Sequence, residues 1–210
     1  MNSTPILKEK HAVVFGAGGT IGAAVAKEFA AEGTEVFLSG RTKANVDAVA
    51  QQIAANGGKA HASVIDTSVD AAVNVYFDGI VKQTYKIDIM LDFAGPLARE
   101  YCKGRMAVDL PVEEFMAPSV TMVKSRFITT GRAAPRHMIK QHSGVIIFVT
   151  GSPARPHVPG ATAIGAALGA MENLAATLVY FKWYRPKQRA SEARPAGKKG
   201  QSASKPASVR

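Results

Sequence analysis

The stretch from Val13 to Gly22 carries the residues best suited to bind a ligand. It reads Val-Val-Phe-Gly-Ala-Gly-Gly-Thr-Ile-Gly, an apolar strand that ends in a glycine-rich turn and continues into a helix. Glycine has no Cβ, so the turn lets the backbone approach a bulky anion, and the helix directs free N–H groups and its positive dipole end to the same place. This pattern predicts a pyrophosphate site for a dinucleotide. The residues expected to form it are Gly16, Gly18, Gly19, Thr20, Ile21 and Gly22, with the Thr20 hydroxyl available to a phosphate.

A second group of polar residues follows the next short apolar strand. Ser39, Arg41 and Thr42 stand where an Asp or Glu would bind the 2′-hydroxyl of NAD, and no acidic residue occupies positions 38–42. A guanidinium pairs well with a phosphate, so Arg41 favours the 2′-phosphate of NADP over NAD. Ser39 and Thr42 are expected as auxiliary donors, and Thr42 also stands where it can cap a helix.

The elements that position these groups alternate along the chain. Strands are predicted at 12–15, 35–38, 60–65, 87–91 and 145–149, and helices at 20–31, 44–55, 69–85, 113–140 and 162–180, with breaks or kinks at Pro118 and Pro135. Strands that alternate with helices at this spacing predict right-handed βαβ units. The expected fold is α/β, a Rossmann-like doubly wound parallel sheet in a three-layer αβα arrangement.

The basic charge of the chain is concentrated at its end. The net charge is +10, but residues 182–210 hold nine Lys/Arg against one Glu, which leaves only +2 for residues 1–181. The end segment is also rich in Pro, Gly and Ser and poor in aliphatic residues, a composition typical of disorder. We therefore expect one dinucleotide-binding domain over 1–181, a disordered basic tail over 182–210, and no specific nucleic-acid partner.

Other features of composition bear on location and on metal binding. The chain has a single cysteine, Cys102, and no apolar leader at its N-terminus, which favours the cytoplasm. The apolar stretch 158–181 contains Glu172 and Asn173 at its middle, so a packed helix is expected there and no membrane span. No group of histidines or other ligands has metal-site spacing, so no metal is expected.

In this order and spacing, the motifs of residues 8–181 resemble those of the short-chain dehydrogenase/reductase family. Gly16, Thr20 and Gly22 stand at the family's Gly-x-x-x-Gly-x-Gly, with Thr20 at the middle glycine. Asp66 stands at the acidic residue that the family places beside the adenine, although the same residue also has the position of a helix N-cap. The run 92–95, Asp-Phe-Ala-Gly, stands at the family's Asn-Asn-Ala-Gly.

The resemblance implies the remaining site residues. Ala94 and Gly95 are expected to lie against the cofactor's ribose, and Ser152 to be the catalytic serine. The function implied is hydride transfer between NADP(H) and a carbonyl or alcohol of unknown identity. The family's catalytic tyrosine and lysine positions fall on Ile164 and Leu168, and no tyrosine in the chain has a lysine four residues later.

This departure leaves a second interpretation open, that of a catalytically impaired family member that binds the cofactor or acts as a scaffold. His157, in the segment after Ser152, is the one histidine placed to replace the missing acid/base. The resemblance also implies a homodimer or homotetramer built on the last two helices. Family members continue with a further strand and a Pro-Gly turn, and the sequence after Tyr180 has neither, so a truncated or frame-shifted C-terminus is expected.

Overall fold

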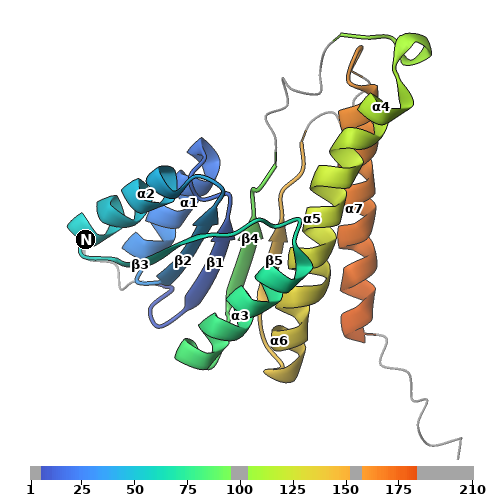
Figure 1. Ribbon diagram of the computed structural model, residues 1–210. Coiled ribbons are helices and arrows are strands. Elements are labelled where there is room, and N and C mark those ends of the chain that lie inside the picture. Colours follow the sequence, from blue (N-terminus) through green and yellow to red (C-terminus); the bar gives the residue numbers. More distant parts are fainter. Residues whose placement is uncertain (1–5, 96–103, 152–157, 184–210) are drawn as a thin grey trace, which may run out of the picture.

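The computed structural model describes residues 6–95, 104–151 and 158–183. Its centre is a five-stranded sheet in the order β3-β2-β1-β4-β5, in which every pairing is parallel (Figure 1). The strands are β1 (His11–Phe15), β2 (Glu35–Gly40), β3 (Lys59–Val64), β4 (Ile89–Asp92) and β5 (Val145–Phe148). This sheet, with helices on its two faces, confirms the predicted Rossmann-like fold.

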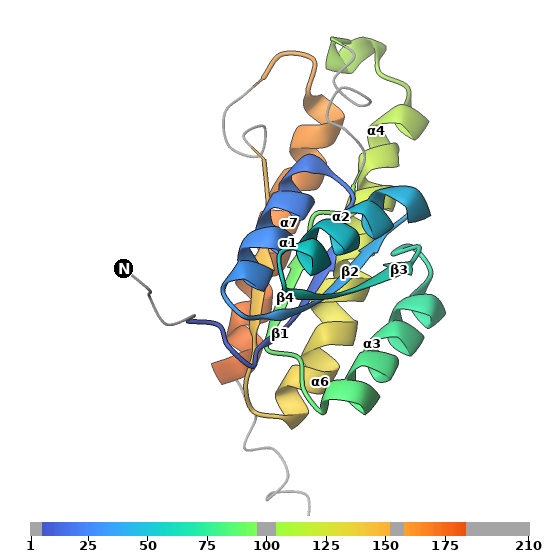
Figure 2. The ribbon, with the colours of Figure 1, turned by 90° about the vertical axis from the view of Figure 1, so that its left-hand side faces the viewer.

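The two faces of the sheet form separate apolar cores. Ala12 and Val14 of β1 pack toward α1 (Thr20–Ala31) and α2 (Lys43–Ala55), whereas Val13 and Phe15 pack toward α3 (Asp70–Thr84) and the helix that ends at Lys140. Successive side chains of a strand point to opposite faces, so one short apolar run fills both layers. Figure 2 shows the sheet between these two sets of helices.

The predicted helix over 113–140 is continuous through both of its prolines. A 3-10 turn, η2 (Ala107–Asp109), precedes this helix. In chain order, the helix consists of α4 (Val112–Pro118), a π-helical segment η3 (Ser119–Val123), α5 (Lys124–Arg126), a second π-helical segment η4 (Phe127–Ala133) and α6 (Ala134–Lys140). A proline cannot donate a hydrogen bond to the carbonyl four residues earlier. The wider π turns lie next to these prolines and rearrange the helix's hydrogen bonds without ending it.

The last helix, α7 (Thr162–Trp183), packs against the long helix and not against the sheet (Figure 1). It continues past the predicted end at 180, into the first two residues of the predicted tail. The rest of that tail lies outside the described residues. In β5, Val145 pairs with Ile89 of β4 and Ile147 pairs with Leu91. Val145 and Ile147 are exposed, although Ile89 and Leu91 on the same face of the sheet are buried.

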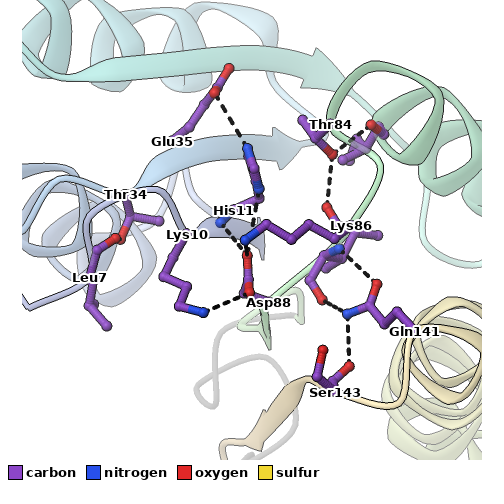
Figure 3. A network of polar contacts seen from close by, with 12 residues as sticks. Leu7, Lys10, His11, Thr34, Glu35, Thr84, Lys86, Asp88, Gln141 and Ser143 are labelled. Carbon is purple, nitrogen blue, oxygen red and sulfur yellow. Dashed lines mark hydrogen bonds and ion pairs between the residues drawn. The ribbon is translucent and has the colours of Figure 1, made fainter.

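The amino ends of the strands are tied together by a network of polar contacts (Figure 3). Asp88 accepts hydrogen bonds from the His11 backbone N–H at 3.0 Å and from the Lys10 ammonium at 3.1 Å, and it lies 3.4 Å from the Lys86 ammonium. Gln141 closes the network by pairing with both the N–H and the carbonyl of Ile87. β4 begins at Ile89 and not at 87 as predicted. The backbone of Ile87 pairs with the Gln141 side chain, whereas the Asp88 N–H donates to the His11 carbonyl at 2.9 Å and the Asp88 carbonyl accepts the Val145 N–H at 2.8 Å.

Candidate dinucleotide-binding site

Two glycines in the turn after β1 are required by close backbone contacts. Gly16 has a φ of +72°, and a Cβ there would lie 2.6 Å from the carbonyl carbon of Phe93, in the segment after β4. A Cβ on Gly22 would overlap the carbonyl oxygen of Gly16. The missing side chains therefore let the turn lie against both the start of α1 and the end of β4, which is the close approach that the sequence predicts.

The turn ends at the N-terminus of α1. Gly19 is the N-cap residue and provides no side chain to cap the helix, while the side chains of Thr20 and Ile21 are exposed. The first N–H groups of a helix have no partner within the helix, and the dipole adds positive potential at the same point. A Cβ on Gly18 would lie 2.9 Å from that of Asn45 at the start of α2. The result is a backbone cradle suited to an anion.

The strand order places this cradle at the point where the chain changes direction across the sheet. The units that follow β1 add β2 and β3 on one side, and the chain then crosses to add β4 and β5 on the other. Ligands of open parallel sheets bind at such a switch point, outside the carboxyl ends of the strands. A dinucleotide with its pyrophosphate at α1 would therefore lie with one half over β2 and β3 and the other half over β4 and β5.

On the β2 side, Arg41 and Thr42 are exposed beside the cradle, whereas Ser39 is buried. Ser39 supports the turn through its carbonyl, which accepts the Ala17 N–H at 3.0 Å, and its hydroxyl has no partner among the described residues. Thr42 is the N-cap residue of α2, as predicted, but its side chain makes no capping hydrogen bond. Arg41 and Thr42 are thus the predicted polar side chains that face solvent here.

Asp66 lies after β3 and organises its own turn. Its carboxylate accepts the Ser68 hydroxyl at 2.7 Å and the Ser68 N–H at 2.9 Å, and these hydrogen bonds, with a contribution from the Arg41 charge, lower the pKa of Asp66. The alternative role of Asp66 as a helix N-cap is wrong, because α3 begins at Asp70 and Val69 is its N-cap. An ionised Asp66 carboxylate therefore lies near Arg41, at the edge where the adenine half of a dinucleotide would lie.

On the β4 side, a buried ion pair holds the segment of Ala94 and Gly95. The Asp92 carboxylate lies 2.8 Å from the Arg126 guanidinium and accepts the Thr129 hydroxyl at 2.6 Å and the Ala94 N–H at 2.7 Å. Burial raises the pKa of Asp92, while Arg126 and the hydrogen bonds oppose that rise. Gly95 lies nearest to Met122 of η3, where a Cβ would make an ordinary contact at 3.9 Å.

Arg126 and Thr129 belong to none of the motifs that the sequence shows. The sequence signal that could have indicated them is Asp92. A carboxylate at the end of a buried apolar strand requires a polar or charged partner. Arg126 and Thr129 are three residues apart on the next helix and therefore share one of its faces. Ser152 and His157 lie outside the described residues, and Ile164 and Leu168 are buried away from this site.

Ile164 and Leu168 lie in an apolar cluster between α7 and η3, together with Met122 and Met171. Their side chains are 3% and 6% exposed. Neither side chain can donate or accept a proton. If a reaction takes place at this site, its acid/base group comes from another position.

The described residues provide neither a metal site nor a membrane span. No three of their His, Cys, Asp and Glu side chains form a group that could hold a metal ion. No helix in this part of the chain is long and apolar enough to cross a membrane.

The sequence profile of the short chain dehydrogenase family matches residues 10–180, which covers the whole sheet and the glycine turn. The chain belongs to this family. Short-chain dehydrogenases are oxidoreductases with a nucleotide-binding Rossmann-like domain that act on small molecules, so the match agrees with the cradle at α1. The resemblance inferred from the motifs is therefore confirmed.

Curated relatives extend beyond the matched region. Gluconate 5-dehydrogenase from Gluconobacter oxydans is 31% identical over 173 residues, which cover 80% of this chain and 63% of that protein. The short-chain reductase protein NovJ from Streptomyces niveus is 32% identical over 179 residues, covering 82% and 65% respectively. The chain thus spans a little under two thirds of the length of these relatives.

Solved structures show the same fold with both nicotinamide dinucleotides. An NAD⁺-bound xylitol dehydrogenase superimposes with a TM-score of 0.75 at 27% identity, covering 84% of this chain and 67% of that one. A metagenomic short-chain oxidoreductase in complex with NADP also has a TM-score of 0.75, at 25% identity and covering 83% and 77%. One of these structures holds NAD⁺ and the other holds NADP, so similarity of fold does not distinguish which dinucleotide this chain binds.

Proposed function

We propose that this protein is an NADP(H)-dependent oxidoreductase that binds its cofactor across the carboxyl ends of β1 and β4. The observation that carries the proposal is the glycine cradle, in which Gly16 and Gly22 have no room for a Cβ and α1 begins without a side-chain cap. When bound, the nicotinamide ring would accept or supply the hydride for an alcohol or carbonyl substrate. The residues of this chain would bind the pyrophosphate, orient the two ribose rings and exclude water.

The preference for NADP rests on Arg41. Its side chain is exposed at the carboxyl end of β2, on the side of the sheet where the adenosine half would lie. A guanidinium can donate to a 2′-phosphate, and the exposed Thr42 hydroxyl can add a further hydrogen bond. Asp66 would lie beside the adenine, with its carboxylate fixed by Ser68.

Reduction of a carbonyl by hydride transfer also requires a proton donor, and the family's positions for the catalytic tyrosine and lysine hold Ile164 and Leu168 in this chain. We propose that Ser152 orients the substrate, in line with its position after β5. Ile164 and Leu168 cannot assist it, because both are apolar and buried. Cofactor binding without turnover is therefore the competing outcome, and the experiment must separate it from catalysis.

The test measures binding and turnover separately. Purified protein is titrated with NADPH and NADH by fluorescence, and NADPH oxidation is then followed with a panel of carbonyl compounds. Tighter binding of NADPH than of NADH, with turnover of at least one carbonyl, supports the proposal. Binding without turnover would support the scaffold role, and no binding of either nucleotide would exclude both.

Substitution of Arg41 tests the cofactor preference. Arg41→Gln should raise the Kd for NADPH by about 10- to 100-fold, because a hydrogen bond to a charged group contributes about 1.5–3 kcal/mol. It should leave the Kd for NADH unchanged. Arg136→Gln, an exposed arginine on α6, is the matched control and should change neither constant. Equal weakening of both nucleotides in Arg41→Gln would contradict the assignment.

We also propose a cytoplasmic homo-oligomer. Support for the association comes from the long helix, where exposed apolar side chains recur at Val112, Met116 and Val120 and again at Phe127. A strip of this kind favours contact with a second copy. Measurement of the solution mass by light scattering tests it, and a monomer at micromolar concentration would contradict it.

A further inference from the structure

Arg126 and Asp92 form a charged pair in the interior, at 4% and 1% exposure, with 2.8 Å between Nη1 and Oδ1. Buried ion pairs add little net stability, because the loss of hydration offsets their attraction. Two buried polar groups at the pair and beside it also lack hydrogen-bond partners in the part of the chain that the structure describes. The Nε of Arg126 and the hydroxyl of the neighbouring Ser125 are buried and have no partner among the described residues. Stability alone therefore does not account for the arginine.

The contacts of the pair converge on one peptide segment. The Asp92 Oδ1 accepts the Ala94 N–H at 2.7 Å, and the Arg126 Nη1 donates to the Ala94 carbonyl oxygen. Thr129 donates its hydroxyl to the other Asp92 oxygen at 2.6 Å. Both polar groups of the Ala94 backbone are thus held by side chains, which restrains the rotation of this segment.

The helix that carries Arg126 has an irregular backbone on both sides of this residue. Arg126 ends the short α-helical turn between two π-helical segments. Its carbonyl accepts the Thr130 hydroxyl at 2.6 Å, and the Thr129 hydroxyl oxygen, whose proton goes to Asp92, lies 3.0 Å from the Ser125 carbonyl oxygen. π-helical turns are rare and often occur at functional sites. Here they accompany a buried guanidinium directed at the segment after β4.

The restrained segment is one wall of the proposed cofactor site. A Cβ on Gly16 would lie 2.7 Å from the Ala94 nitrogen, so the glycine turn and the Ala94 segment are in direct backbone contact at the switch point. The half of a dinucleotide beyond the pyrophosphate, on the β4 side, would lie along this wall. A shift of the wall would therefore affect that half and leave the β2 side untouched.

We propose that Arg126 and Thr129 are positioning residues for the nicotinamide half of the cofactor, acting through Asp92 on the Ala94 backbone. This inference rests on the proposed function. It extends that function by assigning a role to two residues on the long helix. A residue that fixes a wall of one half-site should change affinity for ligands that fill that half-site and not for ligands that stop short of it.

The test compares a whole cofactor with an adenosine fragment. Arg126→Lys keeps the charge but cannot reproduce the guanidinium geometry, and Thr129→Val removes only the hydroxyl. Arg126→Lys should raise the Kd for NADPH by about tenfold, and Thr129→Val by about threefold. The Kd for adenosine 2′,5′-bisphosphate, which fills only the β2 side, should stay within about twofold in both variants. Arg132→Lys, on the same helix in an exposed ion pair with Asp70, is the control and should change neither constant.

The outcomes are distinct. Unchanged NADPH affinity in folded Arg126→Lys and Thr129→Val, with the parent protein binding NADPH, overturns this inference and leaves the proposed function standing. Equal weakening of NADPH and the fragment in Thr129→Val would show a merely structural role and would overturn it as well. A parent protein that binds neither ligand would overturn the proposed function itself.

Discussion

The carboxyl and amino edges of the sheet differ in how their polar groups are satisfied. At the amino edge, Asp88 is surrounded by the His11 N–H and two lysine side chains, and Gln141 binds both backbone groups of Ile87 (Figure 3). At the carboxyl edge, glycines make the closest contacts and α1 begins without a cap. One edge uses its polar groups to join the strands, whereas the other leaves donors available to a ligand. The same five strands thus divide stability and binding between their two ends.

Gly22→Ala should have the largest effect on stability and on cofactor affinity, because it disturbs the glycine turn at the carboxyl edge of the sheet. The added Cβ would overlap the Gly16 carbonyl oxygen, so α1 must move away from the turn. Overpacking of this kind costs about 1–3 kcal/mol of stability. The displaced helix should also lower NADPH affinity by about 100-fold. Urea unfolding and the fluorescence titration measure the two effects.

Gly79 offers a matched control for that substitution. It lies in α3, and a Cβ there would have no atom within 4 Å. Gly79→Ala should stabilise the protein by about 1 kcal/mol, since glycine is a poor helix former, and leave cofactor affinity unchanged. Normal NADPH binding by Gly22→Ala would show that the close contact with Gly16 is not needed for the cradle.

Asp88→Asn should have an intermediate effect, confined to stability. The amide keeps the size of the carboxylate but loses its charge beside Lys10 and Lys86, which should cost about 1–2 kcal/mol at neutral pH. Cofactor affinity should not change, because Asp88 lies at the opposite edge of the sheet. The control is Asp47→Asn, which breaks an exposed pair with Lys43 and should cost under about 0.5 kcal/mol.

The effect of Asp88 should also depend on pH. Partial burial acts to raise the pKa of Asp88, but the hydrogen bonds from His11 and Lys10 and the charge of Lys86 hold it below its ordinary value of 3.8. Its contribution to stability is therefore present above the unfolded-state pKa of about 3.9 and is lost as the pH falls through the lower folded-state value. The difference in unfolding free energy between parent and Asp88→Asn should shrink from pH 5 to pH 3. A constant difference would contradict this role of the charge.

Thr42→Ala should have the smallest effect on stability and a modest one on binding. Thr42 is the N-cap residue of α2 but makes no capping hydrogen bond, so its removal should change stability by less than about 0.5 kcal/mol. A capping threonine would cost about 1 kcal/mol. The Kd for NADPH should rise by about threefold if the hydroxyl binds the 2′-phosphate, with NADH unaffected. A stability loss near 1 kcal/mol would show that the hydroxyl caps the helix in solution.

The order of elements and the glycine turn could be predicted because both depend on local sequence. Alternating apolar strands and helices determine a parallel sheet, and a glycine run between a strand and a helix is typical of a phosphate-binding turn. Helix 113–140 shows where local rules fall short. Pro118 and Pro135 predict breaks or kinks, but the helix, which packs against α3 and α7, continues through both prolines with π turns beside them.

The Asp92 network could not be predicted because it joins residues more than 30 positions apart. The sequence marks Asp92 as a departure from a motif, but the partner of a buried carboxylate is decided by tertiary packing. The burial of Ser39 is a similar case. Its place at the end of a strand suggests a donor at the site, whereas the pleat of β2 directs its side chain into the interior.

The exposed face of β5 has a consequence for handling the protein. Within the described residues, β5 ends the sheet, and Val145 and Ile147 are 55% and 38% exposed on one of its faces. An edge strand with uncovered aliphatic side chains is a template for another extended segment, through main-chain pairing as well as apolar contact. In the part of the chain that the structure describes, β5 is therefore the strand whose edge and exposed aliphatic side chains best fit such pairing.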